Sequence, residues 1–213
     1  MVLATADARV FRSADDGERW TPVLSPRGIA SVGFRGYLLY NRYYADHPGE
    51  VWLVSTEMTG GIFKSNADLT AWTDVSPSPG HGYMPTFVGP DDVYIWESHS
   101  IDDGTHWVPF GPWPTWGPGD YVFSPEDTRT IYFTNSTVGV QKSTTGGITG
   151  PSGEASWTVS NQGLTGMRCV SMSVSTTDPL RVYATFNGWG GVYISDDGTS
   201  HWKYVPIAGS GQM

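Results

Sequence analysis

The sequence contains one cysteine, few basic residues and no long apolar run. Because Cys169 is alone, the chain cannot form an internal disulfide, and we expect this residue to be a small buried hydrophobe. Twelve Lys and Arg residues against 21 Asp and Glu residues give a net charge of −9, which argues against nucleic-acid binding, because phosphate contacts require clustered cations. No apolar stretch reaches the roughly 18 residues of a membrane span, so none is predicted.

Several patterns that would indicate a particular chemistry are also missing. There is no sustained apolar period of about 3.6 residues, so we expect almost no helix. No nucleophile elbow and no phosphate-binding loop occur. The five histidines do not have the spacing of metal ligands, so we predict neither a metal nor a cofactor.

Turn-forming and aromatic residues are abundant instead, with 27 Gly, 15 Pro and 14% aromatics. Residues 13–20 show how they are used, because the pattern Ser-x-Asp-x-Gly-x-x-Trp joins two alternating segments and therefore predicts a β-hairpin. Residues 100–107 repeat this pattern at every defined position. Residues 194–202 keep Asp-x-Gly but have no initial Ser and one additional residue before the Trp. We assign structural roles in these three turns to Ser13, Asp15, Gly17, Trp20, Ser100, Asp102, Gly104, Trp107, Asp196, Gly198 and Trp202.

Weaker copies start at Ser65 and Ser143, and the Trp residues of the five copies lie 52, 35, 50 and 45 positions apart. Such a period, with four short alternating segments per copy, predicts an all-β protein, a β-propeller of about five four-stranded antiparallel blades. A β-sandwich is the alternative, but its turns do not usually repeat one motif at this spacing. We expect one domain over residues 1–213. In the second repeat we expect the first strand at residues 30–34, and the third repeat is short enough to lack one strand.

The first repeat begins at its second strand, and the first seven residues lack the basic start and apolar middle of a signal peptide. We therefore expect either a piece of a longer protein or an oligomer in which another chain completes the ring. A secreted or periplasmic location is favoured.

The repeated turn resembles the Asp-box, the bacterial neuraminidase repeat. The residue pattern of the repeats is most similar to that of xyloglucan-cleaving endoglucanases and oligoxyloglucan cellobiohydrolases. This resemblance implies a propeller with its ligand site on the face opposite the Asp-box turns. Residues 2–12 resemble the strand–Asp–strand element that carries a catalytic Asp in those enzymes, which here is Asp7. The early Arg-Ile-Pro element of sialidases is absent.

Polar residues end the predicted second strands at nearly equivalent positions, which predicts a polar ring around the central channel. Asp7 and Glu57 are the candidate catalytic carboxylates, since glycosidases generally use a carboxyl pair. Alternatively, these residues only form turns or an acidic rim. The other members of the ring are Glu97, Asn135 and Asn187.

Aromatic residues gather in loops of the same face. Trp113 and Trp116 lie among prolines, which stiffen the loop, and Trp189, His81 and Tyr83 are expected nearby. Aromatic rings on stiff loops form stacking platforms for sugars; the alternative is that they fold back over the core. Carbohydrate is therefore the predicted partner. The other hypotheses are a non-enzymatic protein-binding scaffold, as in the similar photosystem II assembly factor and sortilin-type receptors, and a fragment without independent function.

Overall fold

The computed structural model describes residues 1–5, 9–23, 36–40, 45–55, 61–77, 85–95, 98–111, 121–135, 138–147, 156–165, 169–186 and 191–207. Throughout these residues the regular secondary structure is β-strand, as predicted, and no helix that could cross a membrane is found among them. The chain divides into two compact units, residues 1–109 and 110–213.

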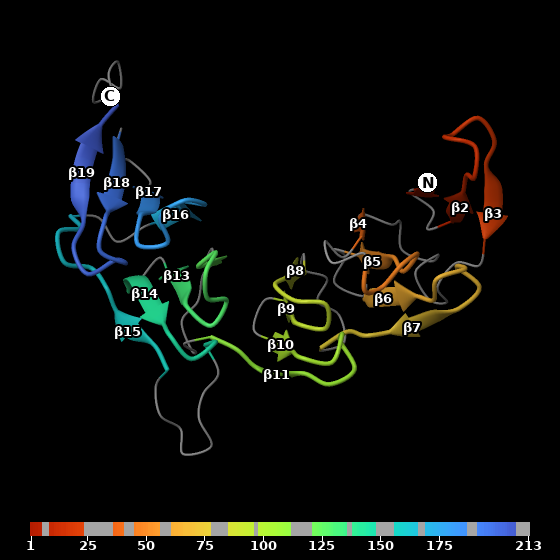
Figure 1. Cartoon of the computed structure of the whole chain (residues 1–213), viewed down its shortest axis with the longest axis horizontal. Coiled ribbons are helices and arrows are strands. Elements are labelled where there is room, and N and C mark those ends of the chain that lie inside the picture. The colour runs from red at the N-terminus through yellow and green to blue at the C-terminus, as the bar shows by residue number, and fades with distance from the viewer. Residues whose placement is uncertain are drawn as a thin grey trace. The chain divides into compact units, whose positions relative to one another are not determined.

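The first unit contains three antiparallel sheets, whose strands follow one another in chain order (Figure 1). We call each sheet a blade. Among the described residues the first blade has three strands, and the next two have four. The strands are β1 (Val2–Ala4), β2 (Val10–Arg12) and β3 (Thr21–Val23); β4 (Gly36–Leu39), β5 (Trp52–Ser55), β6 (Ile62–Ser65) and β7 (Trp72–Asp74); β8 (Thr86–Phe87), β9 (Val93–Ile95), β10 (Ser98–Ser100) and β11 (Val108–Pro109).

The second unit contains two blades of four strands each, again antiparallel and in chain order. β13, β14, β16, β17 and β18 have five or six residues and are longer than any strand of the third blade. β17 has the alternating burial of a strand whose one face packs on a core. The strands are β12 (Tyr121–Phe123), β13 (Ile131–Asn135), β14 (Gly139–Ser143) and β15 (Thr158–Val159); β16 (Cys169–Val174), β17 (Val182–Phe186), β18 (Gly191–Ser195) and β19 (Lys203–Pro206).

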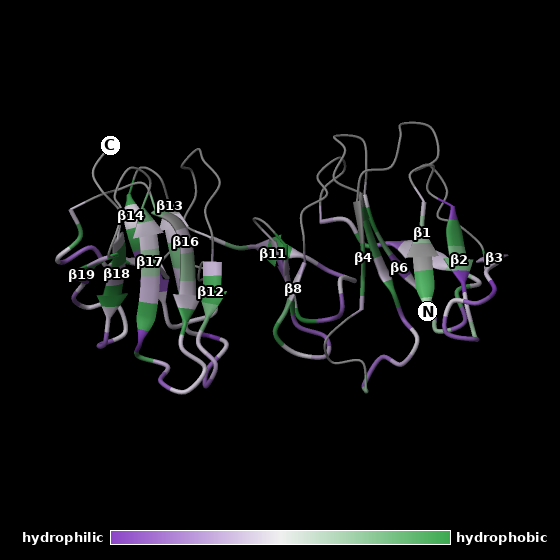
Figure 2. Ribbon diagram, turned by 90° about the horizontal axis from the view of Figure 1, so that it is seen from above, coloured by the Kyte–Doolittle hydropathy of each residue, from purple (hydrophilic) through white to green (hydrophobic). Residues whose placement is uncertain are grey.

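Apolar side chains fill the space between consecutive blades within each unit. In the first unit, Val10 packs with Leu53 between the first and second blades, and Trp52 packs with Phe87 between the second and third. In the second unit a core joins Tyr132 to residues of the fifth blade, Cys169 among them, which confirms its predicted burial. In Figure 2 the hydrophobic segments lie within strands such as β4 and β17, whereas the described turns are mostly hydrophilic.

Two details of the predicted repeats were wrong. The third blade does not lack a strand, because β10 runs directly into the turn motif at Ser100 and its neighbours β8 and β11 have two residues each. The first strand of the second blade is Gly36–Leu39 rather than residues 30–34, which lie outside the described part of the chain. A continuous apolar segment formed this strand, whereas the prediction relied on alternation.

Candidate functional site

The turn between β2 and β3 is closed by one serine and one aspartate. Ser13 Oγ donates to Asp15 Oδ1 at 2.8 Å and accepts the backbone N–H of Gly17 at 2.8 Å. Asp15 Oδ1 also accepts the backbone N–H of Arg19 at 2.9 Å. Two short side chains thus satisfy backbone donors that the turn exposes, which stabilises it locally. We call this arrangement the Ser–Asp turn.

The third blade repeats the Ser–Asp turn between β10 and β11. Ser100 Oγ donates to Asp102 Oδ1 at 2.8 Å and accepts the N–H of Gly104 at 2.9 Å. Asp102 Oδ1 accepts the N–H of His106 at 2.8 Å, and the His106 ring adds a contact between Nδ1 and Asp102 Oδ2 at 2.6 Å. In both turns the Ser, Asp and Gly of the pattern make the contacts that close the turn.

The fifth blade has a complete Ser–Asp turn between β18 and β19, but it begins at Ser195. Ser195 Oγ donates to Asp197 Oδ1 at 2.9 Å and accepts the N–H of Thr199 at 2.8 Å. Asp197 Oδ1 accepts the N–H of His201 at 2.9 Å. The spacing from the serine to the tryptophan is then the same as in the first and third blades, with no additional residue.

The prediction that Asp196 and Gly198 fill the Asp and Gly positions of this turn was therefore wrong by one residue. Gly198 and Thr199 both have a left-handed backbone, with φ of 65° and 74°, so the glycine stands one position earlier than the motif requires. A β-branched residue at positive φ is uncommon, and the pattern gave no reason to expect Thr199 there. Asp196 instead contacts Arg181, with Nε to Oδ1 at 2.6 Å.

The two degenerate turns keep the geometry with other side chains. In the second blade, Asn66 Oδ1 accepts the N–H of Ala71 at 2.8 Å, which is the position that the aspartate caps elsewhere. In the fourth blade, Ser143 Oγ accepts the N–H of Gly147 at 3.0 Å and lies 3.3 Å from Thr145 Oγ1, which replaces the carboxylate.

Tryptophans of the Ser–Asp turns contact the preceding blade. Trp107 Nε1 donates to the Val75 carbonyl at 2.9 Å, and Trp202 Nε1 donates to the Ser160 carbonyl at 2.8 Å. Trp20 of the first turn is 37% exposed. Together with the turn hydrogen bonds, these contacts support a structural role for this end of the blades.

Hydrogen bonds within the turns lower the pKa of their aspartates. The backbone N–H of His106 is the largest cause for Asp102, followed by the His106 ring and Ser100, and the pKa falls from 3.8 to about 2. The pKa of Asp197 also falls from 3.8 to about 2, first because of the His201 N–H. The pKa of Asp15 is lowered as well, chiefly by the Arg19 N–H.

These directions predict how acid affects the fold. Because the folded-state pKa lies below the unfolded one, the stabilisation by Asp197 is complete above about pH 4 and is lost as the pH falls toward 2. We expect Asp197→Asn to melt below wild type at pH 7 and the difference to shrink at pH 2.5, whereas Asp196→Asn has little effect at either pH. Thermal melts followed by circular dichroism measure this. Equal losses for the two variants would contradict the corrected register.

Lysines that precede the serine of one turn reach the turn of the next blade. Lys64 Nζ donates to the Asp103 carbonyl at 3.2 Å and forms an ion pair with its carboxylate, and Lys142 Nζ donates to the Gly198 carbonyl at 3.1 Å. Asp103 and Gly198 hold the same position within their turns. A lysine at the same position of the second and fourth blades therefore connects each of them to the Ser–Asp turn of the blade that follows.

The residues predicted to act on a ligand belong to connections other than the Ser–Asp turns. In the first blade, segment 6–8 joins β1 to β2. In the second, third and fifth blades, the second strand is joined to the third by segments 56–60, 96–97 and 187–190. Segment 112–120 joins β11 to β12. In an antiparallel blade the connection between the second and third strands begins at the end opposite the turn between the third and fourth strands. Asp7, Glu57, His81, Tyr83, Glu97, Trp113, Trp116, Asn187 and Trp189 all lie outside the described residues, and Asn135 is described only as the last residue of β13.

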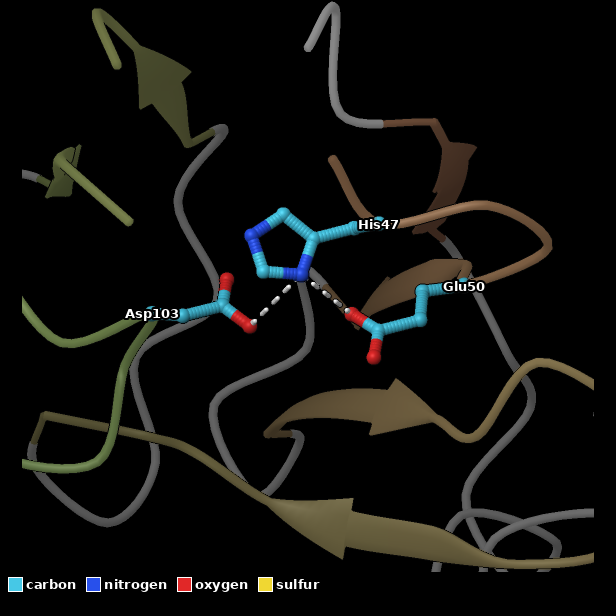
Figure 3. A group of neighbouring side chains, drawn as sticks. All are labelled: His47, Glu50 and Asp103. Carbon is cyan, nitrogen blue, oxygen red and sulfur yellow. Dashed lines mark ion pairs between the residues drawn. The ribbon is translucent and has the colours of Figure 1, made fainter. Parts of the chain in front are cut away.

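A cluster of ionisable side chains lies between the second and third blades, and Figure 3 shows its central members. His47 Nδ1 lies 3.4 Å from Glu50 Oε2 and 3.9 Å from Asp103 Oδ2, and its Nε2 lies 3.1 Å from Asp91 Oδ1. With Lys64 on Asp103, these five residues form what we call the His47 cluster. Its imidazole and carboxylate atoms are of the kinds that bind metal ions, and those of His47, Glu50 and Asp103 lie within 4.8 Å of one another.

Sequence spacing gave no indication of this cluster, and the prediction of no metal site rested on spacing alone. His47 and Glu50 come from the connection between β4 and β5, whereas Asp103 comes from the Ser–Asp turn of the next blade. Only the packing of one blade on the next brings these distant segments together. The sequence signal that could have located it is the long connection 41–50, which exceeds the equivalent turns elsewhere.

The strand order of the blades and their packing within each unit are those of a β-propeller, and similar solved structures agree. YCF48 from Cyanidioschyzon merolae aligns with a TM-score of 0.59 at 15% identity, over 96% of this chain and 68% of that one. An ancestral GH74 enzyme aligns with a TM-score of 0.61 at 17% identity, over 99% of this chain and 30% of that one. A structure of YCF48 bound to D1 peptide gives 0.54 at 12% identity, over 95% and 62%. At these identities the likeness concerns the fold. No family model matches the sequence, and no curated protein is significantly similar to it.

Proposed function

We propose that this chain is an Asp-box β-propeller that binds a plant or microbial polysaccharide through the loops opposite its Ser–Asp turns. The observation that carries the proposal is the division of each blade into two ends. Hydrogen-bonded turns of repeated geometry occupy one end, and strand order directs the segments that contain Asp7, Glu57 and Trp189 to the other.

The aromatic segment 112–120 is flanked by two residues, Phe110 and Tyr121, whose rings are in contact. Phe110 is buried, and its ring contacts that of Tyr121 edge to face, with centroids 5.6 Å apart. Phe110 also packs against Trp157 of the fourth blade. A loop with anchored ends and several prolines loses little conformational entropy on binding, which favours Trp113 and Trp116 as a stacking platform for sugar rings.

Glycoside hydrolysis is the enzymatic form of this proposal, with Asp7 and Glu57 as the carboxyl pair. Ala4 pairs with Val10 at the base of the turn that contains Asp7, and Val54 pairs with Ile62 at the base of the turn that contains Glu57. Because the first two blades pack through a shared core, we expect both turns to leave neighbouring sheets at the same end. The similarity to a GH74 enzyme is consistent with this assignment.

A titration with xyloglucan oligosaccharide tests the binding proposal. We expect saturable binding that weakens at least tenfold in Trp113→Ala/Trp116→Ala, because two stacking surfaces are lost. The matched control is Trp20→Ala, which removes a partly exposed tryptophan from the opposite end and is expected to bind like wild type. Isothermal titration calorimetry measures the affinities. The proposal is overturned if a panel of plant and microbial glycans shows no binding, or if the Trp20 variant loses as much as the loop variant.

A reducing-sugar assay on the same material distinguishes binding from hydrolysis. If the chain cleaves the glycan, Asp7→Asn is expected to abolish turnover while retaining binding, since a carboxamide cannot exchange the proton. Turnover that survives in Asp7→Asn excludes this residue as the catalytic carboxyl.

A protein-binding scaffold is the second candidate, and the YCF48 structures favour it. The chain accounts for 68% of the length of YCF48 from Cyanidioschyzon merolae but for 30% of the GH74 enzyme, and one YCF48 structure holds D1 peptide. In this case peptides selected from a display library should bind the wild type and lose affinity in the Trp113→Ala/Trp116→Ala variant, with no glycan binding.

A further inference from the structure

We propose that the His47 cluster binds a single Zn²⁺ ion, with His47, Glu50 and Asp103 as its protein ligands. The cluster places three carboxylates around one imidazole, and the third carboxylate belongs to Asp91. Lys64 is the one permanent cation that the structure records in contact with these described residues. The proposal is independent of any glycan or peptide ligand.

The distances between the ligand atoms suit a small tetrahedral ion. Two ligands bound to Zn²⁺ at about 2.0–2.2 Å in a tetrahedron lie roughly 3.3–3.6 Å apart. The distance from His47 Nδ1 to Glu50 Oε2 is 3.4 Å, and that from His47 Nδ1 to Asp103 Oδ2 is 3.9 Å. Small side-chain shifts therefore bring all three atoms into a first coordination sphere, and water supplies the fourth ligand.

Asp91 orients the imidazole for metal binding. Its Oδ1 lies 3.1 Å from His47 Nε2. With the proton on Nε2 it accepts that hydrogen bond, and the lone pair of Nδ1, the ring nitrogen that faces Glu50 and Asp103 in Figure 3, is free to bind a metal. Zinc-binding histidines almost always donate the N–H of their other ring nitrogen to a hydrogen-bond acceptor such as a carboxylate. This carboxylate comes from the third blade and is not itself one of the three ligands.

Glu50 provides a second, independent indication. Its side chain is 25% exposed, but its Oε2 is shielded from solvent and accepts no hydrogen bond from the residues that the structure describes. A buried carboxylate oxygen without a donor is costly, whereas coordination to a cation compensates it. The same oxygen is the one that faces His47 Nδ1.

The ligand set selects zinc rather than calcium or magnesium. Calcium takes six to eight oxygen ligands and magnesium prefers octahedral oxygen, whereas an imidazole with two carboxylates suits Zn²⁺. Lys64 already contacts Asp103 Oδ2 and thus competes with the ion. Rotation of the Asp103 carboxylate gives one oxygen to the ion and the other to Lys64, so both cations can be accommodated at a cost in affinity.

Zinc at this position connects two blades, because His47 and Glu50 belong to the second and Asp103 to the third. An ion that binds only the folded arrangement raises the melting temperature. The proposed site is therefore a structural clip at the Ser–Asp end of the first unit.

Calorimetric titration of the chelator-treated, full-length chain with ZnCl₂ tests the proposal. We expect one ion per chain, a melting temperature that rises with zinc, and no comparable response to Mg²⁺ or Ca²⁺. His47→Gln and Glu50→Gln should each weaken zinc binding at least tenfold. His201→Gln is the matched control, because it removes a histidine that contacts an aspartate in an equivalent turn of the fifth blade, and it should bind like wild type.

Lys64→Gln separates a metal site from a network of ion pairs. Removal of the competing cation should tighten zinc binding severalfold, although it removes an ion pair with Asp103. Circular dichroism in the presence of chelator verifies that each variant is folded; if one is not, the remaining variants decide. The proposal is overturned if zinc does not bind at one ion per chain, if the His47 and His201 variants lose equal affinity, or if Lys64→Gln binds zinc more weakly.

Discussion

Replacement of Trp52 by alanine is expected to lower the free energy of unfolding by about 3–5 kcal/mol. Trp52 is fully buried between the second and third blades and meets Phe87 edge to face, with ring centroids 5.2 Å apart. Alanine at this position leaves a large cavity between two sheets whose short strands, such as β8, cannot readily shift to fill it.

Trp52→Phe is the informative comparison, because the indole N–H finds no acceptor among the described residues. Phenylalanine keeps an aromatic surface toward Phe87 and removes a buried donor that is not hydrogen-bonded, so it should cost less than half of what alanine costs. Urea unfolding followed by circular dichroism measures both. If the two variants lose equal stability, the indole N–H has a partner and the interpretation of this core is incorrect.

Replacement of Gly147 by alanine is expected to cost about 2–4 kcal/mol, through backbone strain and steric overlap together. Its φ is +69°, a conformation that disfavours residues with a Cβ atom. A Cβ atom there would lie 2.4 Å from Phe110 Cε2 and 2.7 Å from Trp157 Cζ2, and both of these rings are buried.

Thr144→Ala is the control for Gly147→Ala, because it lies exposed in the same turn and should change the free energy of unfolding by less than about 0.5 kcal/mol. Chemical unfolding of the two variants under identical conditions gives the difference. A Gly147→Ala variant as stable as Thr144→Ala would show that this turn tolerates a side chain and is not a constrained part of the fourth blade.

The repeat could be predicted from sequence because each blade is a local structure. Alternating strands, a turn that needs Ser and Asp at fixed positions, and a tryptophan that packs on the preceding blade all lie within one repeat or at its border. The prediction failed where another residue type makes the same contact. Asn66 caps the amide that an aspartate caps elsewhere, and Thr199 takes a left-handed backbone that the pattern reserves for glycine.

The candidate ligand residues depend on a different kind of inference. From strand order we expect the segments that contain Trp113, Trp116, Asp7 and Glu57 at the end opposite the Ser–Asp turns, but specificity depends on how these loops are arranged in space. The His47 cluster could not be predicted for a related reason. It requires contact between separate blades, and no local pattern links residues 47 and 103.

The central claim is that the two ends of the blades have different functions, structural at the Ser–Asp turns and ligand-binding at the opposite loops. Calorimetric titration of xyloglucan oligosaccharide into Asp197→Asn and Trp113→Ala/Trp116→Ala, both verified as folded, tests this most directly. We predict that the Asp197 variant binds with wild-type affinity although its melting temperature is lower, whereas the loop variant loses at least tenfold in affinity with little change in melting temperature. The opposite result, with affinity lost in the Asp197 variant and retained in the loop variant, would contradict the claim.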